Sequence, residues 1–368
     1  MFVGIDKFGC DHARSGLGSY LLSFIAHLPQ NGEHKFELFG LEEDRYTYNP
    51  GKEIPFVSPS NKLGLKNESA WHRRHANKFI AKRKYDAVIY PAIENVVPKS
   101  FKTESIAIVN FLFSKIIAGG NKKQISQVKN TLKKISHIVV ASEVLKDDLI
   151  KNGVDTSKIK VVHNGIDQKI FYPAIDTLLS QDVVDIKPFA IKRPYFIYAS
   201  RLAGSEKKHI ELIKAFNLFK EKTHAPHRLV LAGADGPSLE QVHKAAFESP
   251  FGEDILLTGY FPYESLPKLY GCSDACIFPA VNEGVGLPVL EAMACGVPVL
   301  CSNSGSLPEM GGNVPLYFDS DNIEQISSLM EKIVTDKELR KKMVTNGIEW
   351  CSAFNWEKTV GETLSLLS

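Results

Sequence analysis

Short apolar runs alternate with amphipathic stretches of helix length along almost the whole chain. This alternation is typical of parallel β-strands joined by crossover helices. In the first half we expect strands at Phe2–Ile5, Phe36–Phe39, Ala87–Tyr90, Ile106–Val109, Ile138–Val140 and Lys160–Val162. In the second half we expect them at Tyr195–Ala199, Leu229–Ala232, Ile255–Thr258, Ala275–Phe278, Val297–Cys301 and Leu316–Phe318. The pattern predicts an α/β fold with two doubly wound, Rossmann-like sheets.

The length of 368 residues exceeds what one hydrophobic core usually supports, so two domains are expected. Residues 174–194 contain Pro188 and Pro194 and show no sustained periodicity, which indicates a linker. We therefore expect a first domain at 1–173 and a second at 195–352. A final helix at about 353–368 could pack back on the first domain. Two such domains would face each other across a cleft.

Two helix starts carry capping signals. Ser142 precedes an amphipathic stretch that Gly153 closes, which is typical of an N-cap and a C-terminal stop. Thr335 and Glu338 have the spacing of a capping box. Both helices are expected to begin at these residues.

The formal net charge of +2 gives the chain no field that favours nucleic acid as a partner. One stretch, Lys62–Lys84, is locally basic. We interpret it as a solvated helix face or, alternatively, as a peripheral contact with anionic lipid head groups. Nothing approaches about eighteen consecutive apolar residues, and no secretory leader is visible. The expected location is the cytoplasm, with the inner face of the membrane as a peripheral site.

The six cysteines show neither paired CxxC elements nor the His spacing of zinc sites. We expect them to be reduced and mostly buried. The sequence therefore predicts a protein that needs neither a metal nor a cofactor.

Two predicted loops could hold a phosphate, because parallel sheets bind ligands beyond the carboxyl ends of their strands. The first carries Arg201 and Lys207, whose charges suit a pyrophosphate. The second runs from Glu283 through a glycine-rich turn into a helix that carries Glu291. Taken alone, the two cations could equally be solvated side chains at a helix start. The glycine-rich loop could likewise be a plain turn with two unrelated acids.

Glu283-Gly284-Val285-Gly286-Leu287-Pro288 resembles the EGFGLP turn of the family-four retaining glycosyltransferases with the GT-B fold, also called glycosyl transferases group 1. Val285 stands where that family usually has an aromatic residue. Further similar segments are Val162–Asp167, Arg201–Phe216, Leu231–Gly233, Thr258–Tyr260 and Val299–Glu309. They cover most of the second half of the chain and resemble enzymes of bacterial surface-polysaccharide assembly.

The resemblance implies a role for each matching residue. Arg201 and Lys207 should bind the donor diphosphate and steady the leaving group, Glu283 should hold hydroxyls of the donor sugar, and Glu291 should bind the ribose. Backbone N–H groups around Gly286 and Leu287 should assist. The segment Ser15–Tyr20, with Gly16 and Gly18, matches the glycine loop that approaches the phosphates in this family; its alternative is a plain glycine turn.

One position departs from the family pattern. Many relatives have a His-Asp pair after the strand that here ends at Val109, whereas this chain has Asn110-Phe111. Asn110 either takes over binding of the donor sugar or marks impaired catalysis, and we favour the first. His72 and His75 are interpreted as surface or internally bonded histidines, with a place at the acceptor side of the cleft as the alternative.

The resemblance implies a retaining, metal-independent transferase. It would move a hexosyl unit, in particular a mannosyl unit, from a GDP- or UDP-sugar to a glycan or lipid-linked acceptor. One alternative is a GT-B sugar-nucleotide epimerase, which would isomerise the donor when no acceptor is present. The other is a catalytically silent GT-B partner subunit, suggested by Asn110-Phe111.

Overall fold

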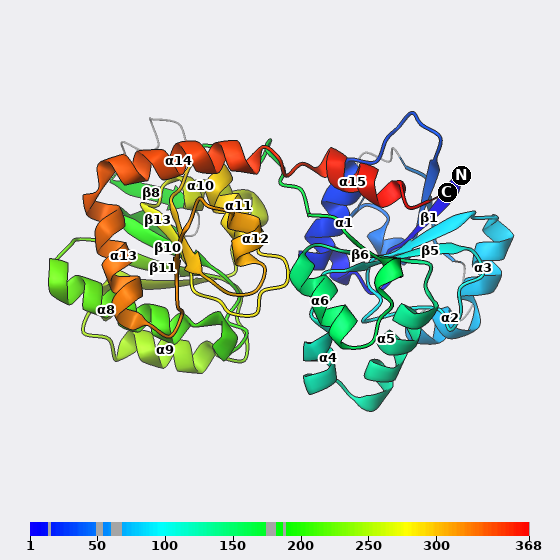
Figure 1. Cartoon of the computed structure of the whole chain (residues 1–368), viewed down its shortest axis with the longest axis horizontal. Coiled ribbons are helices and arrows are strands. Elements are labelled where there is room, and N and C mark those ends of the chain that lie inside the picture. Colours follow the sequence, from blue (N-terminus) through cyan, green and yellow to red (C-terminus); the bar gives the residue numbers. More distant parts are fainter. Residues whose placement is uncertain (14–15, 49–53, 60–67, 174–181, 187–188, 368) are drawn as a thin grey trace. The chain divides into compact units, whose positions relative to one another are not determined.

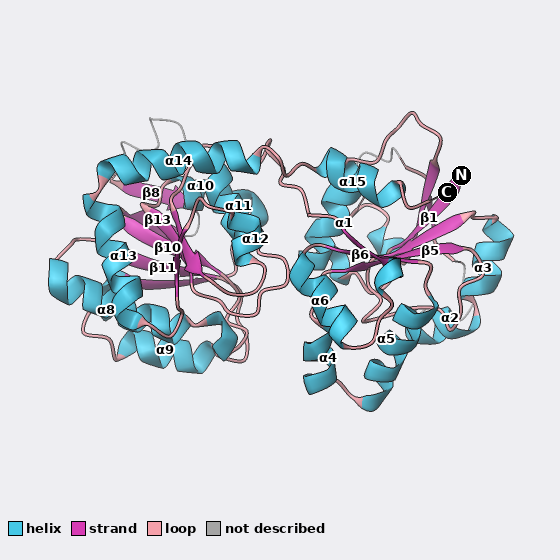
Figure 2. Ribbon diagram, in the orientation of Figure 1, coloured by secondary structure: helices cyan, strands magenta, loops and turns pink. Residues whose placement is uncertain are grey.

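The computed structural model describes residues 1–13, 16–48, 54–59, 68–173, 182–186 and 189–367. The chain divides into two units, Met1–Gly165 with Asn355–Ser368, and Ile166–Phe354. Each unit has a central sheet with helices on both faces (Figure 2). The predicted α/β fold with two doubly wound sheets is confirmed.

The first unit contains, among its described residues, a seven-stranded parallel sheet in the order β3-β2-β1-β4-β5-β6-β7 (Figure 1). Its strands are β1 (Phe2–Asp6), β2 (Lys35–Phe39), β3 (Phe56–Val57), β4 (Ala87–Tyr90), β5 (Glu104–Val109), β6 (His137–Val140) and β7 (Ile159–Val161). Its α-helices are α1 (Gly16–Ala26), α2 (Glu68–Arg74), α3 (Ala76–Arg83), α4 (Phe113–Gly119), α5 (Lys122–Lys134), α6 (Glu143–Lys151) and α15 (Trp356–Leu364). Short 3-10 helices lie at η1 (Asp11–Ala13), η2 (Glu42–Asp44) and η3 (Thr156–Lys158).

The second unit has, within the described ranges, a six-stranded parallel sheet in the order β12-β11-β10-β13-β14-β15. Its strands are β10 (Tyr195–Ala199), β11 (Arg228–Ala232), β12 (Ile255–Gly259), β13 (Ala275–Phe278), β14 (Val299–Ser302) and β15 (Leu316–Phe318). Its α-helices are α8 (His209–Thr223), α9 (Leu239–Phe247), α10 (Leu266–Gly271), α11 (Leu287–Ala294), α12 (Leu307–Gly311), α13 (Ile323–Thr335) and α14 (Lys337–Cys351). Its 3-10 helices are η4 (Ser205–Lys207), η5 (Gly252–Asp254) and η6 (Tyr263–Ser265).

The segment expected to be a linker contributes to the second unit. Residues 174–181 and 187–188 lie outside the described residues. The rest forms an antiparallel hairpin of β8 (Val183–Ile186) and β9 (Phe189–Lys192). Val184, Ile186 and Ile191 are buried in the same core as Ile166 and Phe171. The chain therefore enters the second unit at Ile166 and not after residue 173.

The last helix, α15, returns to the first unit. Trp356 and Val360 are buried in its core, and the Trp356 ring meets Tyr20 edge-on at 5.3 Å. Gly165 makes this approach possible, because an added Cβ would lie 2.4 Å from the backbone nitrogen of Trp356. Packing against α1 rather than helix propensity fixes this C-terminal segment.

The two capping predictions have different outcomes. The Ser142 prediction is confirmed, since its Oγ accepts a hydrogen bond from the Leu145 N–H at 3.2 Å. The Thr335 prediction is wrong. Thr335 ends α13, and Asp336 caps α14 by accepting from the Leu339 N–H at 2.9 Å. All six cysteines are buried as free thiols, as expected.

Candidate active site

Three of the expected site residues follow adjacent strands of the second sheet. Arg201 and Lys207 come after β10, and Glu283 comes after β13. These two strands are neighbours, and the order of the sheet reverses between them. Such a reversal opens a crevice beyond the carboxyl ends of the strands, where ligands bind in this class of fold.

Lys207 and Glu283 form an ion pair in which Lys207 Nζ donates to Glu283 Oε1. Their side chains are 20% and 19% exposed, so the pair remains accessible to a ligand. The Tyr198 hydroxyl fixes the main chain at Lys207 by donating a hydrogen bond to the Lys207 carbonyl at 2.8 Å. The two loops are also joined by the Val281 N–H, which donates to the Glu206 carbonyl at 2.8 Å. The structure thus brings together the cation and carboxylate that the sequence placed 76 residues apart.

The Glu283 backbone lies against a glycine of the next loop. Gly305 has a φ of +61°, and an added Cβ would lie 2.5 Å from the Glu283 carbonyl oxygen. The Ser306 N–H donates to the same oxygen at 3.0 Å. Only glycine allows this approach at Gly305, so the loop after β14 fixes the position of Glu283.

The turn that follows Glu283 leads directly into the N-terminus of a helix. Gly286 has a φ of +73° and caps α11, which begins at Leu287. An added Cβ at Gly286 would crowd Met310 and Leu307 at 3.1 and 3.2 Å. Unpaired amide groups and the helix dipole at such an N-terminus favour an anion. Gly286 and Leu287 are therefore placed as the sequence predicted, at the start of a helix beside Glu283.

Glu291 lies deeper in α11 than the other site residues. It is buried, and its carboxylate accepts long hydrogen bonds from the hydroxyls of Tyr263 at 3.4 Å and Tyr270 at 3.5 Å. Burial raises the pKa of Glu291 to about 7, although the two tyrosine hydroxyls oppose the rise. Sequence reasoning missed both tyrosines; their only signal is that they follow β12, Tyr263 in η6 and Tyr270 within α10.

The raised pKa of Glu291 predicts a pH-dependent stability. Below pH 4.5 the carboxyl is protonated in both folded and unfolded chains, and between pH 4.5 and 7 only the unfolded chain ionises. Folding stability is therefore lost as pH rises through this window. Glutamine does not ionise, so over this pH range the free energy of unfolding of Glu291→Gln should fall by about 1 to 3 kcal/mol less than that of the wild type. Thermal unfolding of both proteins without ligand, from pH 4.5 to 7.5, measures it; parallel profiles would contradict the burial effect.

Arg201 is more exposed than Lys207. Its Nε donates to the carbonyl of Asp235, in the loop after β11, at 3.2 Å. It is therefore tethered to the neighbouring loop. The next lysine, Lys208, is paired with Asp321 at 2.6 Å and Glu211 at 3.4 Å, which leaves Lys207 as the member of this lysine pair that faces Glu283.

The remaining expected residues belong to the first unit. Gly16 begins α1 and is exposed, and an added Cβ there would meet no described atom within 4 Å. Gly18 is buried in the same helix, while Ser15 lies outside the described residues. Asn110 follows β5, and its Oδ1 is closed off from solvent without a hydrogen-bond partner in the described part of the chain. An unpartnered buried oxygen is costly, which favours a binding role for Asn110.

His72 is an internally bonded histidine. It is buried on α2, with Nε2 2.8 Å from Asp6 Oδ2 and Nδ1 2.9 Å from the Glu68 carbonyl. His75 follows α2 and is exposed. The structure supports the first interpretation for His72, in which both ring nitrogens are satisfied within the protein.

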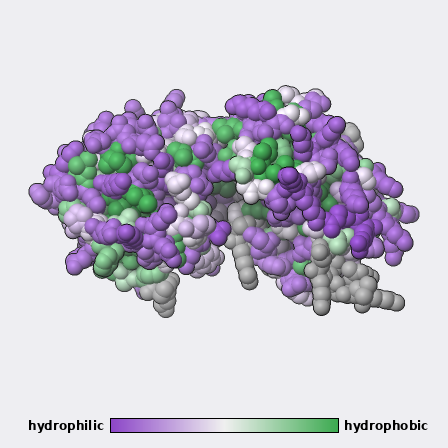
Figure 3. Space-filling model, turned by 90° about the horizontal axis from the view of Figure 1, so that it is seen from below, coloured by the Kyte–Doolittle hydropathy of each residue, from purple (hydrophilic) through white to green (hydrophobic). Residues whose placement is uncertain are grey.

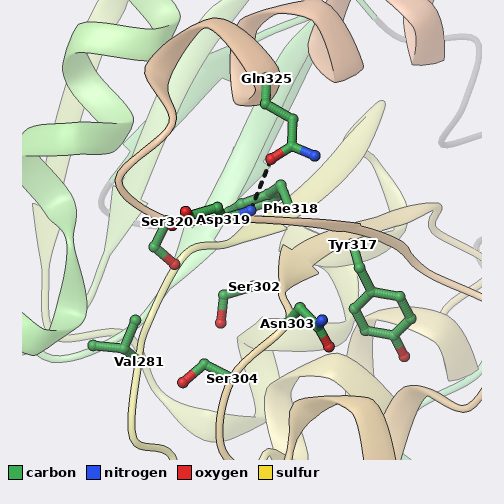
Figure 4. A pocket seen from close by; sticks show the side chains of 9 residues that line it. All are labelled: Val281, Ser302, Asn303, Ser304, Tyr317, Phe318, Asp319, Ser320 and Gln325. Atoms are coloured by element: carbon green, nitrogen blue, oxygen red, sulfur yellow. Dashed lines mark hydrogen bonds between the residues drawn. The ribbon is translucent and has the colours of Figure 1, made fainter.

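A cavity of about 500 Å³ lies beyond the carboxyl ends of β14 and β15 (Figure 4). The Ser302 hydroxyl donates to the Ala280 carbonyl at 2.5 Å, and the Ser320 hydroxyl donates to the Pro279 carbonyl at 2.6 Å. These bonds hold the chain that leads into Glu283. Two of the serines that line this cavity therefore support the loop that leads into Glu283.

Among the residues that the structure describes, no three His, Cys, Asp or Glu side chains are arranged to hold a metal ion. Metal independence remains a prediction. In the same described ranges, no helix combines the length and the apolar character needed to cross a bilayer.

Two family models match the chain. The model described as Glycosyl transferases group 1 matches residues 182–350, and the model described as Glycosyltransferase Family 4 matches residues 14–169. Together they cover most of both units.

Curated relatives include enzymes of known activity. The chain is 33% identical over 154 residues to O-antigen chain mannosyltransferase B of Escherichia coli, a match that covers 42% of this chain and 40% of that enzyme. It is 24% identical over 270 residues to alpha-maltose-1-phosphate synthase of Mycolicibacterium smegmatis, with 67% of each chain covered. The chain thus spans less than half of the mannosyltransferase.

Solved structures share the complete fold. Anabaena HepE in complex with UDP and glucose matches 99% of both chains with a TM-score of 0.76 and 16% identity. Sucrose-phosphate synthase from Thermosynechococcus elongatus matches 100% of this chain and 98% of its own, with a TM-score of 0.75 and 17% identity. These likenesses show that the chain has the GT-B fold, with two Rossmann-like domains.

Proposed function

We propose that this chain, which belongs to the GT-B glycosyltransferases of group 1 and family 4, transfers a hexosyl unit from a nucleoside diphosphate sugar to a glycan or lipid-linked acceptor. The observation that carries the proposal is the Lys207–Glu283 ion pair. It lies where the second sheet reverses its order, beside the N-terminus of α11. In this proposal the cation for the diphosphate and the carboxylate for the sugar hydroxyls lie side by side, so one sugar nucleotide can reach both.

Each group has a role in this proposal. Lys207, Arg201 and the amides at Gly286 and Leu287 bind the diphosphate and stabilise the charge that develops when it leaves. Glu283 accepts hydrogen bonds from hydroxyls of the donor sugar. Lys207 and Glu283 neutralise each other before the donor binds, so an arriving diphosphate takes Lys207 and frees the Glu283 carboxylate.

Glu291 binds the ribose of the nucleotide. Two ribose hydroxyls can donate to its carboxylate, and this favours the ionised form that burial disfavours. In the first unit, the backbone at Gly16 and Gly18 approaches the phosphates and Asn110 hydrogen-bonds the donor sugar.

A mannosyl donor is favoured by the similarity to the Escherichia coli mannosyltransferase, and GDP or UDP is the nucleotide. The structure of HepE with UDP supports a nucleotide of this kind. We further propose transfer with retention of configuration and without a divalent metal or cofactor. Lys207, Arg201 and the α11 dipole would supply the positive potential that a metal supplies elsewhere.

Thermal unfolding of the purified chain with UDP, GDP, ADP, CDP and their common sugars tests the proposal. A ligand that binds the native state raises the melting temperature by an amount set by its concentration and affinity. We expect one nucleotide to raise the melting temperature, and we expect the Lys207→Ala variant to show no such rise. If none of the nucleotides or sugar nucleotides shifts the melting temperature, the proposed function fails.

Replacing Glu283 by glutamine should lower kcat roughly tenfold or more, because a neutral amide holds the sugar hydroxyls less strongly. The dissociation constant of the bare nucleotide should not rise, since Glu283 contacts the sugar and not the nucleoside, and the loss of its charge frees Lys207 for the diphosphate. Glu211→Gln is the control, because Glu211 pairs with Lys208 and not with Lys207. Equal losses of nucleotide affinity and turnover would refute the role on the sugar side.

We also propose a peripheral contact with anionic lipid through the Lys62–Lys84 region. Residues 62–67 lie outside the described residues, but α2 and α3 present Arg74, Lys78 and Lys82 to solvent. Each lysine near an anionic bilayer contributes about 1 kcal/mol, so Lys78→Glu with Lys82→Glu should weaken binding at least tenfold. Sedimentation with phosphatidylglycerol vesicles measures the fraction of protein that is bound to lipid. Lys341→Glu with Lys342→Glu on α14 gives the same charge change as a control, and equal binding by both double variants would exclude this surface.

A further inference from the structure

Two ionisable side chains are buried against each other at the end of β1. Hydrophilic residues cover most of the face of the molecule drawn in Figure 3, whereas the side chains of Asp6 and His72 are only 2% and 0% exposed. Asp6 is the last residue of β1, and His72 lies on α2, 66 residues later. His72 Nε2 is 2.8 Å from Asp6 Oδ2. A buried charge is costly unless it is paired, so the protonation state of these two groups decides whether the contact stabilises the fold.

The partners of the His72 ring determine its protonation state. Nε2 meets the Asp6 carboxylate, and Nδ1 lies 2.9 Å from the main-chain carbonyl oxygen of Glu68. Asp6 Oδ1 accepts a hydrogen bond from the Phe8 N–H at 3.0 Å, which favours the ionised carboxylate. Both ring nitrogens therefore face groups that only accept, whereas a neutral imidazole has a single N–H. We conclude that both nitrogens carry protons and that His72 is a buried imidazolium.

The same groups hold the main chain of the loop that follows β1. Besides the bond from Phe8 to Asp6, the Gly9 N–H donates to Glu68 Oε2 at 3.0 Å. The Phe8 ring packs edge-on against the His72 ring, with 4.9 Å between the ring centroids. Two successive amides of the loop are thus bonded to carboxylates, one at the end of β1 and one on α2. The conformation of this loop depends on the contact between Asp6 and His72.

Ionisable groups from several elements act on this pair. They are Glu68 on α2, Cys10 in the loop after β1, Asp44 on η2 and Tyr90 on β4. Burial raises the pKa of both Cys10 and Tyr90, so these two groups are neutral near pH 7. Burial also raises the pKa of Glu68. Lys7, the residue next to Asp6, has a pKa lowered to about 8 by burial, but its Nζ donates to the Asp44 carbonyl and not to Asp6.

We propose that His72 is a positioning residue whose charged ring ties the loop after β1 to α2, and that loss of the ring proton releases this loop. The inference rests on the proposed transferase function. The loop continues through η1 toward α1, whose Gly16 approaches the donor phosphates in that function. His72 acts on transfer only through Asp6 and Glu68. It adds a loss of activity on the alkaline side of the pH profile.

Pairing with Asp6 stabilises the fold in a pH-dependent way. Burial lowers the pKa of His72, but the charge and the hydrogen bond of Asp6 outweigh this effect and raise it above the ordinary value of 6.5. The contribution of the pair is therefore fully present below pH 6.5 and is lost as the pH rises through the folded pKa. Thermal unfolding of the wild type and His72→Gln from about pH 5.5 to 9.5 measures it.

We expect His72→Gln to melt below the wild type at pH 6 and the difference to shrink as the pH rises. The titrations of Lys7 and Glu291 occur in both proteins, so they cancel in this difference. His75→Gln is the matched control, because His75 is an exposed histidine just after α2. Its melting profile should run parallel to that of the wild type. A profile of His72→Gln that is also parallel to the wild type would overturn the proposal.

The ring protons and the loop can be observed directly in the full chain. Long-range ¹H–¹⁵N spectra of protein labelled with ¹⁵N-histidine report the protonation of each ring nitrogen, and the His72 signals are those missing from His72→Gln. We expect both nitrogens to be protonated at pH 6.5 and one to lose its proton at higher pH. Hydrogen exchange at the Phe8 and Gly9 amides, relative to the intrinsic rate at each pH, should lose protection over the same range. An unprotonated ring nitrogen at pH 6.5, or protection that is unchanged through the titration, would overturn the clamp.

Transfer assays separate a positioning role from a merely structural one. We expect kcat/KM of the wild type to fall roughly tenfold as the pH rises through the His72 titration, the effect of losing about one charge-assisted hydrogen bond. His72→Gln should already be lower at pH 6.5 and should lack this step, whereas His75→Gln should retain it. The same step in His72→Gln would leave His72 a structural role only.

The result for His72 can be distinguished from that for the proposed function. If no nucleotide raises the melting temperature of the wild type, the transferase is refuted whatever the state of the ring. If a nucleotide does so but the His72 ring is neutral at pH 6.5, the transferase stands and the clamp is refuted.

Discussion

Lys207→Ala should lower kcat on the order of a hundredfold, the loss typical of removing one preorganised charge stabiliser. Lys207 Nζ contacts Glu283, and Lys207 lies in the loop that follows β10. In the proposed transfer the departing diphosphate gains negative charge beside Lys207, and no solvent reorganisation is needed because the lysine is already in place. Steady-state transfer or donor hydrolysis, with the nucleotide identified by thermal unfolding, measures the loss.

Lys208→Ala is the matched control for this experiment. Lys208 is the next residue, but it is paired with Asp321 and Glu211, away from Glu283. Its hydrogen bond to Asp321 raises the pKa of the Lys208 ammonium. We expect Lys208→Ala to change kcat less than about threefold, since an exposed ion pair contributes little. If both alanine variants lost activity equally, Lys207 would have no special role at the diphosphate.

The strands were predictable because those of a parallel sheet are buried on both faces and appear as continuous apolar runs. β4 is an example, with all four residues from Ala87 to Tyr90 buried. β3 was missed because it comprises only Phe56 and Val57. The hairpin of β8 and β9 was missed because its inward residues alternate with exposed ones and stand among prolines.

The errors at element ends have local causes. Thr335 and Asp336 are adjacent, and either residue type can cap a helix. The spacing to Glu338 favoured Thr335 as the cap of α14. In the structure α13 continues through Thr335, and Asp336 is the cap. The first unit ends at Gly165 because Ile166 and Phe171 join the core of the second. Core membership of single residues depends on packing, which periodicity does not encode.

The active site was predictable in its residues but not in its contacts. Lys207 and Glu283 each follow a strand, so their common edge could be inferred, whereas their ion pair depends on the two loops meeting at Val281 and Glu206. Burial of Glu291 beneath two tyrosine hydroxyls had no signal in the sequence. The free Oδ1 of Asn110 likewise appears only once β5 is placed.

Gly305→Ala should lower kcat on the order of a hundredfold although Gly305 carries no side chain to bind a ligand. The added Cβ would lie 2.5 Å from the Glu283 carbonyl oxygen and 2.7 Å from its nitrogen, so the Glu283 backbone must move. A displacement of about 1 Å at a group that positions substrate is enough for such a loss. Stability should also fall, by about 1 to 3 kcal/mol, because alanine is strained at a φ of +61°.

Gly153→Ala separates these two effects. Gly153 has a φ of +84°, but an added Cβ would meet no described atom within 4 Å, so the variant carries backbone strain without a collision. We expect it to lose about 1 kcal/mol of stability and to keep its kcat. Thermal unfolding of both variants measures the cost of the backbone strain. Transfer assays on both measure the effect on kcat of displacing Glu283. Wild-type kcat in Gly305→Ala would mean that the position of Glu283 does not govern transfer, whereas a loss confined to Gly305→Ala assigns it to the displaced carboxylate.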